Sequence, residues 1–393
     1  MRFTTKVLPS RTANLFVLTL NNPKALHALS LDMMHFFQDI LKECYADDSV
    51  GALLVKSNTT GMKTKAFCAG GDVKRVYRSC LEEQDSSVLG QGKPGLDSAE
   101  FFRQEYVVNH MMATATKPQI SLWDGIVMGG GVGISVHGKY RIATENTILA
   151  MPETNIGLFP DVGSMFWMPK MLPHSVATYM ALTGHRLEAA DLLYTGIATH
   201  YIPSARLDDL ESALSTASKS FKPTERAEDF AAPVLMSFHE QPPMDPHDSY
   251  LAQERPAIDK VFGILSDRSK GVEDVVESLE NLNSDFGRKT AGILNTMSPT
   301  SLKVTLEGLR RGKDMSRIGD DLCMEFRMSQ ACMRIGSDFH DGIRAALVDK
   351  DRNPQWQPAT LAEVTEQIVE SYFLPLEYEW EIPVTKTKIS SNL

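Results

Sequence analysis

Two acidic residues in one proline- and glycine-rich segment are the best candidates in this chain for acid–base or nucleophilic chemistry. Glu153 follows Pro152 at the end of a largely apolar run, and Asp161 follows the apolar segment 158–160. Both side chains are therefore expected to be partly buried, and burial raises the pKa of a carboxyl group towards neutrality. Two carboxyl groups in different surroundings can divide the work of hydrolysis, one attacking or activating water and the other exchanging a proton.

Two glycine clusters could supply backbone hydrogen-bond donors to such a reaction. One lies within 66–73 and contains Gly71, and the other lies within 125–133 and contains Gly130. Most glycine clusters serve only tight turns and close packing. A backbone N–H needs no side chain, however, and glycine permits close approach of a ligand, so both amides could bind one carbonyl oxygen. The triple glycine at 129–131 would also open a helix, whose N-terminal field favours negative charge.

Composition and motif spacing argue against several other kinds of site. The five cysteines include no C-x-x-C pair and the ten histidines no H-E-x-x-H spacing, so we expect neither a metal ion nor a disulfide framework. Cys68 has no histidine within its motif and is interpreted as a small buried apolar residue rather than a nucleophile. The net charge of −10 argues against a nucleic-acid surface. No apolar run reaches the ~18 residues that a membrane span requires.

The first half of the sequence alternates short apolar runs with glycine-rich turns and helical stretches. The runs at 15–20, 52–55, 120–123 and 147–151 are typical of buried strands, which predicts an α/β domain. Segment 84–98 is rich in Gly, Ser and Asp, and we expect it to be a mobile loop that is too polar to pack.

The second half of the sequence is expected to be mainly helical. Ser298 and Pro299 form an N-cap and first-turn pair ahead of an apolar helix face. The proline- and charge-rich stretch 219–256 is interpreted as a connection. We therefore expect two parts, a catalytic core over residues 1–215 and a mainly helical C-terminal region over residues 216–393.

Three motifs together resemble those of the crotonase (enoyl-CoA hydratase/isomerase) superfamily. They lie at 66–73, 125–133 and 151–163. The resemblance implies a crotonase-type spiral of strand-strand-helix turns, with an acyl-coenzyme A (acyl-CoA) substrate bound by residues 1–215. The pairing of 152–154 with 159–163, together with the C-terminal segment 342–345, is similar to the hydrolases of this superfamily that cleave short hydroxyacyl-CoA thioesters.

The resemblance also implies roles for the candidate residues. The two backbone donors of the family's oxyanion site fall on Gly71 and Gly130. Glu153 attacks the carbonyl carbon of the thioester or activates water, and Asp161 handles protons or the hydroxyl group of the substrate. The sequence leaves a mixed anhydride on Glu153 and direct attack by water as alternatives.

Two further residues match substrate-contacting positions of the family. Glu105 matches a glutamate that contacts the substrate, although an exposed helix charge is an equally common role for such a residue. Lys74 follows the Gly71 turn, where the family places a basic residue near the adenine and phosphates of coenzyme A, and a solvated lysine is the alternative. Coenzyme A is part of the substrate, so no separate cofactor is expected.

The resemblance implies hydrolysis of a short branched hydroxyacyl-CoA, 3-hydroxyisobutyryl-CoA, as in valine breakdown. The alternatives are hydration or isomerisation of an enoyl-CoA, and a non-catalytic scaffold such as a mitochondrial ribosome component. Gly133 favours the hydrolase, because enoyl-CoA hydratases resemble this segment but carry a second glutamate there. Its missing side chain is also expected to leave room beside the acyl group.

The expected location and partners follow mainly from the same resemblance. It implies the mitochondrial matrix, while the C-terminal tripeptide Ser391-Asn392-Leu393 is a loose relative of a peroxisomal address and leaves a peroxisome-like organelle as the alternative. The expected partner is the acyl-CoA substrate, with neither nucleic acid nor membrane. A homo-oligomer is left open.

Overall fold

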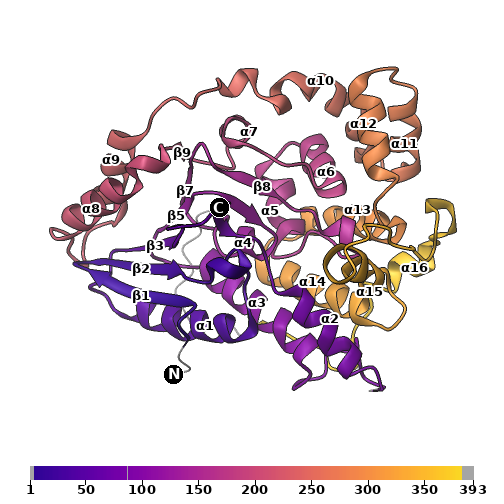
Figure 1. Cartoon of the computed structure of the whole chain (residues 1–393), viewed down its shortest axis with the longest axis horizontal. Coiled ribbons are helices and arrows are strands. Elements are labelled where there is room, and N and C mark those ends of the chain that lie inside the picture. The colour runs from indigo at the N-terminus through magenta and orange to yellow at the C-terminus, as the bar shows by residue number, and fades with distance from the viewer. Residues whose placement is uncertain (1–3, 86, 383–393) are drawn as a thin grey trace.

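Two β-sheets form the centre of the computed structural model, which describes residues 4–85 and 87–382 (Figure 1). The larger sheet has the spatial order β1 (Val7–Thr12), β2 (Leu15–Leu20), β3 (Ala52–Ser57), β5 (Gln119–Trp123), β7 (Tyr140–Ala143) and β9 (His200–Tyr201). The smaller sheet has the order β4 (Ala66–Cys68), β6 (Ile126–Met128) and β8 (Ile148–Ala150). Pairing is parallel throughout these described strands except between β1 and β2.

From β3 to β8, consecutive strands alternate between the two sheets. This is the spiral that the sequence predicted, and the α/β class is confirmed. The C-terminal tripeptide discussed above lies outside the described residues.

The strands of the larger sheet are buried on both faces, as their continuous apolar runs predicted. On β3, Leu53 and Val55 face the main core, whereas Ala52 and Leu54 face a second, smaller core. That smaller core is closed by α8 (Leu207–Ser218) and α9 (Glu228–Phe238), which lie against the outer face of the sheet.

The remaining helices surround the two sheets and extend to one side of them (Figure 1). In the first half they are α1 (Leu31–Ala46), α2 (Val73–Glu82), α3 (Asp97–Ala113), α4 (Gly130–Gly133), α5 (Ser164–Met171), α6 (His174–Thr183) and α7 (Ala189–Tyr194). After α9 they are α10 (Tyr250–Phe262), α11 (Val272–Glu280), α12 (Asp285–Leu294), α13 (Pro299–Asp314), α14 (Ile318–Met333), α15 (Asp338–Ile343) and α16 (Glu366–Glu370). The predicted start of a helix at Pro299 is confirmed, since the Ser298 hydroxyl accepts the Ser301 N–H at 2.9 Å.

The C-terminal helices pack back onto the first half of the chain. Helix α13 contacts α5, α14 contacts α3, and α15 contacts the 3-10 helix Glu153–Ile156. The proposed division into residues 1–215 and 216–393 falls inside α8, and α9 packs against that helix. We keep this division as a proposal about the organisation of the chain.

The interpretation of 219–256 as a plain connection is wrong. The stretch contains all of α9 and the first half of α10, with Pro233 and Pro256 inside the two helices. A proline inside a helix removes one hydrogen bond and is usually destabilising. Here each helix also buries apolar side chains, such as Leu235 and Ile258, and that burial offsets the lost bond.

The prediction that segment 84–98 is too polar to pack is also wrong. Leu89 is buried, and Gly90 and Gly92 both have positive φ angles, +74° and +75°. A Cβ atom added to Gly90 would lie 2.7 Å from the Gln330 carbonyl oxygen, so the segment lies directly against the backbone of α14. Glycine makes this close contact possible.

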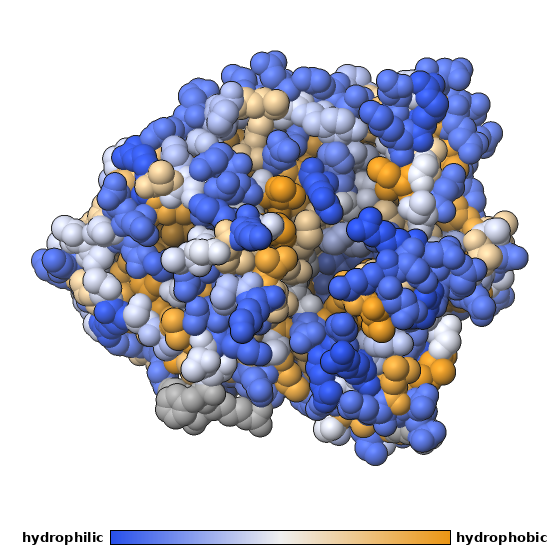
Figure 2. All heavy atoms as spheres, in the orientation of Figure 1, coloured by the Kyte–Doolittle hydropathy of each residue, from blue (hydrophilic) through white to orange (hydrophobic). Residues whose placement is uncertain are grey.

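The hydropathy of the surface and of the helices bears on contact with a membrane. The face drawn in Figure 2 is mostly hydrophilic, with apolar side chains in small scattered groups. None of the described helices is both long enough and apolar enough to cross a bilayer. The described residues also include no group of three His, Cys, Asp or Glu side chains arranged to hold a metal ion.

Candidate active site

The two glycine clusters meet at the ends of neighbouring strands. β4 and β6 pair in parallel, with Ala66 opposite Ile126, and the chain continues from them into Gly71 and Gly130. A Cβ atom added to Gly130 would lie 3.2 Å from the Gly71 nitrogen, so the two residues are adjacent. Within the described chain, neither N–H donates a hydrogen bond. Both amides therefore remain free to bind one oxygen atom.

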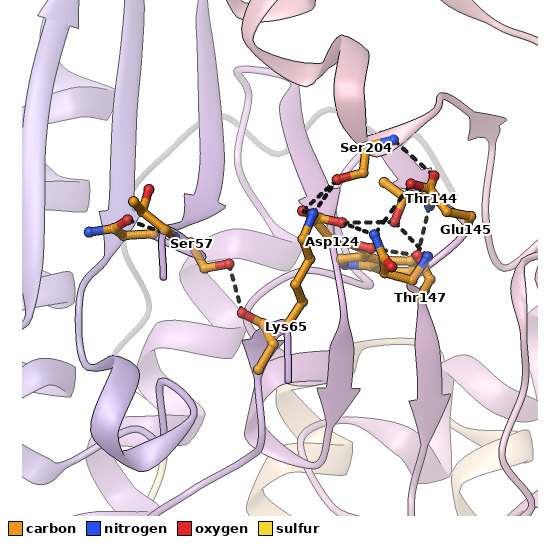
Figure 3. Close-up of polar contacts among 12 residues, drawn as sticks. Ser57, Lys65, Asp124, Thr144, Glu145, Thr147 and Ser204 are labelled. Carbon is orange, nitrogen blue, oxygen red and sulfur yellow. Dashed lines mark hydrogen bonds and ion pairs between the residues drawn. The ribbon is translucent and has the colours of Figure 1, made fainter. Parts of the chain in front are cut away.

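A polar network fixes the opposite ends of the same two strands (Figure 3). Lys65 directly precedes β4, Asp124 lies just before β6, and Lys65 Nζ is 2.9 Å from Asp124 Oδ2. Asp124 also accepts hydrogen bonds of 2.9 to 3.1 Å from Ser204, Thr144 and Asn146. Burial acts to raise the pKa of Asp124, but the hydrogen bonds from Lys65, Asn146 and Ser204 outweigh it and lower that pKa. The network thus joins the starts of the two strands whose other ends lead into the glycine amides.

Two glutamates border these amides. Glu153 begins the 3-10 helix after β8, and its Oε1 lies 2.8 Å from the position of a Cβ added to Gly129. Glu105 lies on α3, and its Oε1 would overlap a Cβ added to Gly130. Only 2% of Glu105 is exposed, which excludes the alternative of a solvated helix charge. Burial, followed by the charge of Asp161, raises the pKa of both glutamates well above its usual value.

Asp161 completes a group of three buried carboxyl groups. Tyr106, the neighbour of Glu105 on α3, donates its hydroxyl to Asp161 Oδ2 at 3.0 Å. Burial raises the pKa of Asp161 to about 7, against the opposing effect of this hydrogen bond. The next residues, Val162 and Gly163, have φ angles of +56° and +86°, so the chain turns sharply after Asp161. Within the described residues, none of the three carboxyl groups has a lysine or arginine partner.

This arrangement suits attack on a carbonyl group. Two N–H donors can stabilise an oxygen atom as it becomes negative, and carboxyl groups with raised pKa values can exchange protons near neutral pH. The sequence predicted that burial would shift the pKa values of Glu153 and Asp161 in this direction, and this prediction is confirmed.

Glu325, a residue of the C-terminal region, supports the loop that carries Asp161. It is fully buried on α14, where its Oε2 accepts the Gly163 N–H at 2.7 Å and its Oε1 accepts the Met165 N–H at 3.2 Å. Gly163 has no side chain to cap α5, so Glu325 supplies the acceptor from a distant helix. Burial, together with the charges of Asp321 and Asp161, raises the pKa of Glu325. Sequence reasoning missed this residue because no local motif marks it.

Lys74 and Cys68 lie close to the glycine turn. Lys74 is in the first turn of α2, and its Nζ donates a hydrogen bond to the Leu347 carbonyl at 3.3 Å. Its role towards coenzyme A stays a prediction. Cys68 is fully buried, and burial raises the pKa of its thiol to about 12, which agrees with its interpretation as an apolar residue.

The expectation of free space beside Gly133 is wrong. A Cβ atom added there would lie 2.5 Å from the Val162 Cβ and 2.8 Å from the Asn109 Nδ2. The missing side chain is thus used for close packing of α4 against α3 and the Asp161 loop. What Gly133 still excludes is a second glutamate at this position.

The match to a family model identifies the class of protein that this site belongs to. The chain matches the model described as Enoyl-CoA hydratase/isomerase over residues 15–373. That range covers most of the 393 residues, and the chain therefore belongs to the enoyl-CoA hydratase/isomerase (crotonase) family. The superfamily and fold that the sequence motifs predicted are confirmed.

Several relatives within this family carry one particular name. The mitochondrial 3-hydroxyisobutyryl-CoA hydrolase of Xenopus tropicalis is 42% identical over 366 residues, which are 92% of this chain and 86% of the relative. The protein of the same name from Homo sapiens is 40% identical over 360 residues, with the same two coverages of 92% and 86%. The expected similarity to hydroxyacyl-CoA hydrolases is therefore confirmed.

Solved structures extend the likeness over the helical C-terminal region. A structure titled carnitinyl-CoA dehydratase, from Mycobacterium thermoresistibile, has a TM-score of 0.81 and 34% identity, and covers 96% of this chain and 98% of its own. A structure titled enoyl-CoA hydratase, from Rhodobacter sphaeroides, has a TM-score of 0.78 and 29% identity, with coverages of 95% and 98%. Both ends of the described chain thus belong to one recurrent architecture.

Proposed function

We propose that this protein is an acyl-CoA thioester hydrolase that converts 3-hydroxyisobutyryl-CoA to 3-hydroxyisobutyrate and coenzyme A, a step of valine catabolism. One observation carries the proposal: the buried carboxyl groups of Glu105 and Glu153 border two glycine amides that have no acceptor of their own, and the charge of the buried Asp161 acts on both glutamates. The relatives named above support the choice of substrate, since they carry the name of this hydrolase and match 92% of the chain.

The proposed reaction uses the amides and two of the carboxyl groups in turn. The thioester oxygen accepts hydrogen bonds from the Gly71 and Gly130 N–H groups, and ionised Glu153 attacks the carbonyl carbon or takes a proton from the attacking water. When the tetrahedral intermediate collapses, the C–S bond breaks and protonated Asp161 gives its proton to the departing thiolate. A pKa of about 7 allows Asp161 to give and regain that proton near neutral pH.

The two routes for Glu153 differ in where an oxygen atom from water arrives. If Glu153 forms a mixed anhydride, water that attacks the glutamyl carbonyl in ¹⁸O-labelled solvent leaves label in the Glu153 side chain. If Glu153 only activates water, all label enters the product acid. Label found in Glu153 by mass spectrometry of a tryptic digest after several turnovers would show an anhydride that water opens at the glutamyl carbonyl.

A cavity of about 420 Å³ is proposed to admit the coenzyme A arm. Its lining includes Asp72 and Arg75 near the start of α2 and Phe101 on α3. The Phe101 ring lies 2.7 Å from the position of a Cβ added to Gly71, so this lining residue separates the cavity from the glycine turn. Lys74, between Asp72 and Arg75, is proposed to meet the adenine and phosphates of coenzyme A. Glu105 is proposed to contact the acyl part of the substrate.

Hydration of an enoyl-CoA is the second candidate function. The solved structures titled carnitinyl-CoA dehydratase and enoyl-CoA hydratase favour it, because they share the fold over nearly the whole chain. Gly133 argues against it, since no carboxylate stands at that position and the space is filled by Val162 and Asn109. Beside Glu153, the carboxyl groups of the site are then Glu105 on α3 and Asp161 on the loop after Glu153.

Location and assembly follow the same proposal. The relatives named above are mitochondrial proteins, and we place this chain in the mitochondrial matrix. The acyl-CoA substrate is the partner that the site requires, and we propose that no cofactor is needed beyond it. A homo-oligomer is proposed as the assembly to test by light scattering.

The deciding experiment compares two signals from the purified protein. Release of free thiol from 3-hydroxyisobutyryl-CoA, followed with a thiol reagent, is expected, together with negligible loss of enoyl absorbance from crotonyl-CoA. Rapid loss of enoyl absorbance without thiol release would assign a hydratase instead. Inactivity in both assays, together with co-migration with ribosomal particles, would support the non-catalytic scaffold.

A further inference from the structure

Asn109 is a buried amide without a hydrogen-bond partner next to the carboxyl groups of the site. It lies on α3 and is fully buried. In the described part of the chain, neither its Oδ1 nor its Nδ2 has a hydrogen-bond partner. A buried polar side chain left unpaired destabilises the fold, so such a residue needs an explanation beyond packing.

Asn109 lies on the same helix as Glu105, the residue proposed to contact the acyl part of the substrate. Glu105 and Asn109 are four residues apart on α3 and therefore share one face of that helix. Glu105 Oε1 meets α4 at Gly130, whereas Asn109 Nδ2 meets α4 at Gly133, nearly one turn further on. The other neighbour of Gly133 is Val162, the residue after Asp161. Asn109 thus meets α4 at the same glycine as the Asp161 loop does.

The chemistry of an amide suits a hydroxyl group at this place. A hydroxyl both donates and accepts hydrogen bonds, and the asparagine side chain offers two N–H donors and one carbonyl acceptor to match it. In the proposed substrate, the hydroxyl group is on the second carbon beyond the carbonyl carbon. Asn109 Nδ2 lies beside Gly133, three residues along α4 from the Gly130 amide at which the carbonyl oxygen is proposed to bind.

We propose that Asn109 binds the hydroxyl group of the acyl chain and so determines the preference of the enzyme for hydroxylated over plain acyl thioesters. This inference rests on the proposed function, because it assumes that the acyl carbonyl lies at the Gly71 and Gly130 amides. It assigns Asn109 to substrate specificity, and leaves attack and proton transfer to Glu153 and Asp161.

The test measures discrimination between 3-hydroxyisobutyryl-CoA and isobutyryl-CoA, which differ only by the hydroxyl group. Wild-type protein and Asn109→Leu are compared by thiol release, and Asn109→Ser is a second variant in case leucine prevents folding. We expect the ratio of the two kcat/KM values to fall about tenfold in both variants, mainly through loss on the hydroxylated substrate. An unchanged ratio with equal losses on both substrates would overturn the inference.

A binding measurement separates failure of this inference from failure of the proposed function. Glu153→Gln protein with and without Asn109→Leu is titrated calorimetrically with both thioesters, and the Kd ratio should again fall about tenfold. If the ratio falls while wild-type protein releases no thiol, the inference holds and the hydrolase assignment fails. If wild-type protein is active and the Kd ratio does not change, the inference alone fails.

A matched control comes from α14. Gln330 is also a fully buried amide whose side-chain atoms have no partner within the described residues, but it is not among the nearest neighbours of a Cβ added to Gly133. Gln330→Leu is expected to leave the substrate ratio unchanged. A fall in the ratio as large as that of Asn109→Leu would show that loss of any buried amide has this effect, and would overturn the assignment.

Discussion

Substitution Gly130→Ala tests the oxyanion site with the smallest possible change. The added Cβ atom would overlap Glu105 Oε1 and would lie 3.2 Å from both the Gly71 nitrogen and the Leu29 Cδ1. Glu105 is almost fully buried and has little freedom to move away. The methyl group therefore fills the space in which the thioester oxygen must approach the two amides.

The size of the effect follows from the loss of these donors. Removing one donor of an oxyanion site typically costs about 10²- to 10³-fold in kcat, or about 2.7 to 4 kcal/mol of transition-state stabilisation. Gly130→Ala does not remove an N–H group but displaces the oxygen from both, so we expect a loss of kcat/KM of at least about 10²-fold. The φ angle of Gly130 is not in the left-handed region, so the backbone itself accepts alanine without strain.

The assay is thiol release, accompanied by circular dichroism and thermal unfolding. Gly292→Ala is the matched control, because a Cβ atom added to Gly292 on α12 meets nothing within 4 Å. Alanine is the better helix former by about 1 kcal/mol, so Gly292→Ala should keep full activity and unfold at a slightly higher temperature. A folded Gly130→Ala protein with wild-type kcat/KM would place the carbonyl oxygen elsewhere and refute this reasoning.

Four other predictions concern residues that act on or support this site. Glu153→Gln should abolish turnover but keep thioester binding, as judged by calorimetry, because the amide cannot attack or accept a proton; substantial residual hydrolysis would remove Glu153 from the mechanism. Asp161→Asn should flatten the pH–rate profile near pH 7. It should also stabilise the protein, because in the wild type the ionisation of this buried carboxyl group lowers the stability of the folded state as the pH rises from ~4 to about 7. The gain in unfolding free energy is at most about 4 kcal/mol above pH 7 and is absent below pH ~4. Equal melting temperatures of wild type and Asp161→Asn at pH 8 would contradict this prediction. Glu325→Gln should lower kcat about tenfold with little change in KM, and it should shift the limb of the pH–rate profile near pH 7. The reason is that one backbone N–H of the turn before α5 loses its acceptor and Asp161 moves. An unchanged pH limb would make Glu325 merely structural. Lys65→Met should destabilise the protein by about 1–3 kcal/mol at pH 7 and by less at pH 3. The lowered pKa of Asp124 stabilises the folded state above the unfolded pKa, and this stabilisation is lost as the pH falls. A loss of stability that does not depend on pH would argue against an ionic role of Lys65.

Sequence patterns predicted those strands whose apolar character is continuous. β2, for example, lies at Leu15–Leu20 as expected, because its side chains are buried on both faces. β1 was missed because it is an edge strand, with Pro9 in its middle and five of its six residues exposed. α9 and α10 were missed because proline usually interrupts a helix, and only their packing shows why these two tolerate it.

The site was predictable as far as its chemistry is concentrated in local motifs. The glycine turns and the pair Glu153 and Asp161 each carry a local signal, whereas Glu105 resembles an ordinary helix charge in sequence. Its burial depends on the approach of α4, which local sequence does not encode. The same holds for Glu325, whose contact with Gly163 spans 162 residues. Groups that support a site from a distant helix leave no periodicity and no motif in the sequence.

The contact between α15 and the turn of Glu153 joins the C-terminal helices directly to the candidate site. A Cβ atom added to Gly157 would overlap the backbone of Asp338, and one added to Gly342 would overlap the backbone of Ile156. Each of these two glycines thus lets its own segment lie directly against the backbone of the other.

With Glu325 holding the Asp161 loop, the C-terminal region supports both carboxyl groups that the proposed reaction uses. These groups need that support because burial makes their ionised forms costly and no cation beside them within the described residues offsets the cost. A carboxyl group in this position would relax towards solvent unless the backbone around it were fixed. In the proposed reaction, α14 and α15 therefore hold the backbone on which the two carboxyl groups depend.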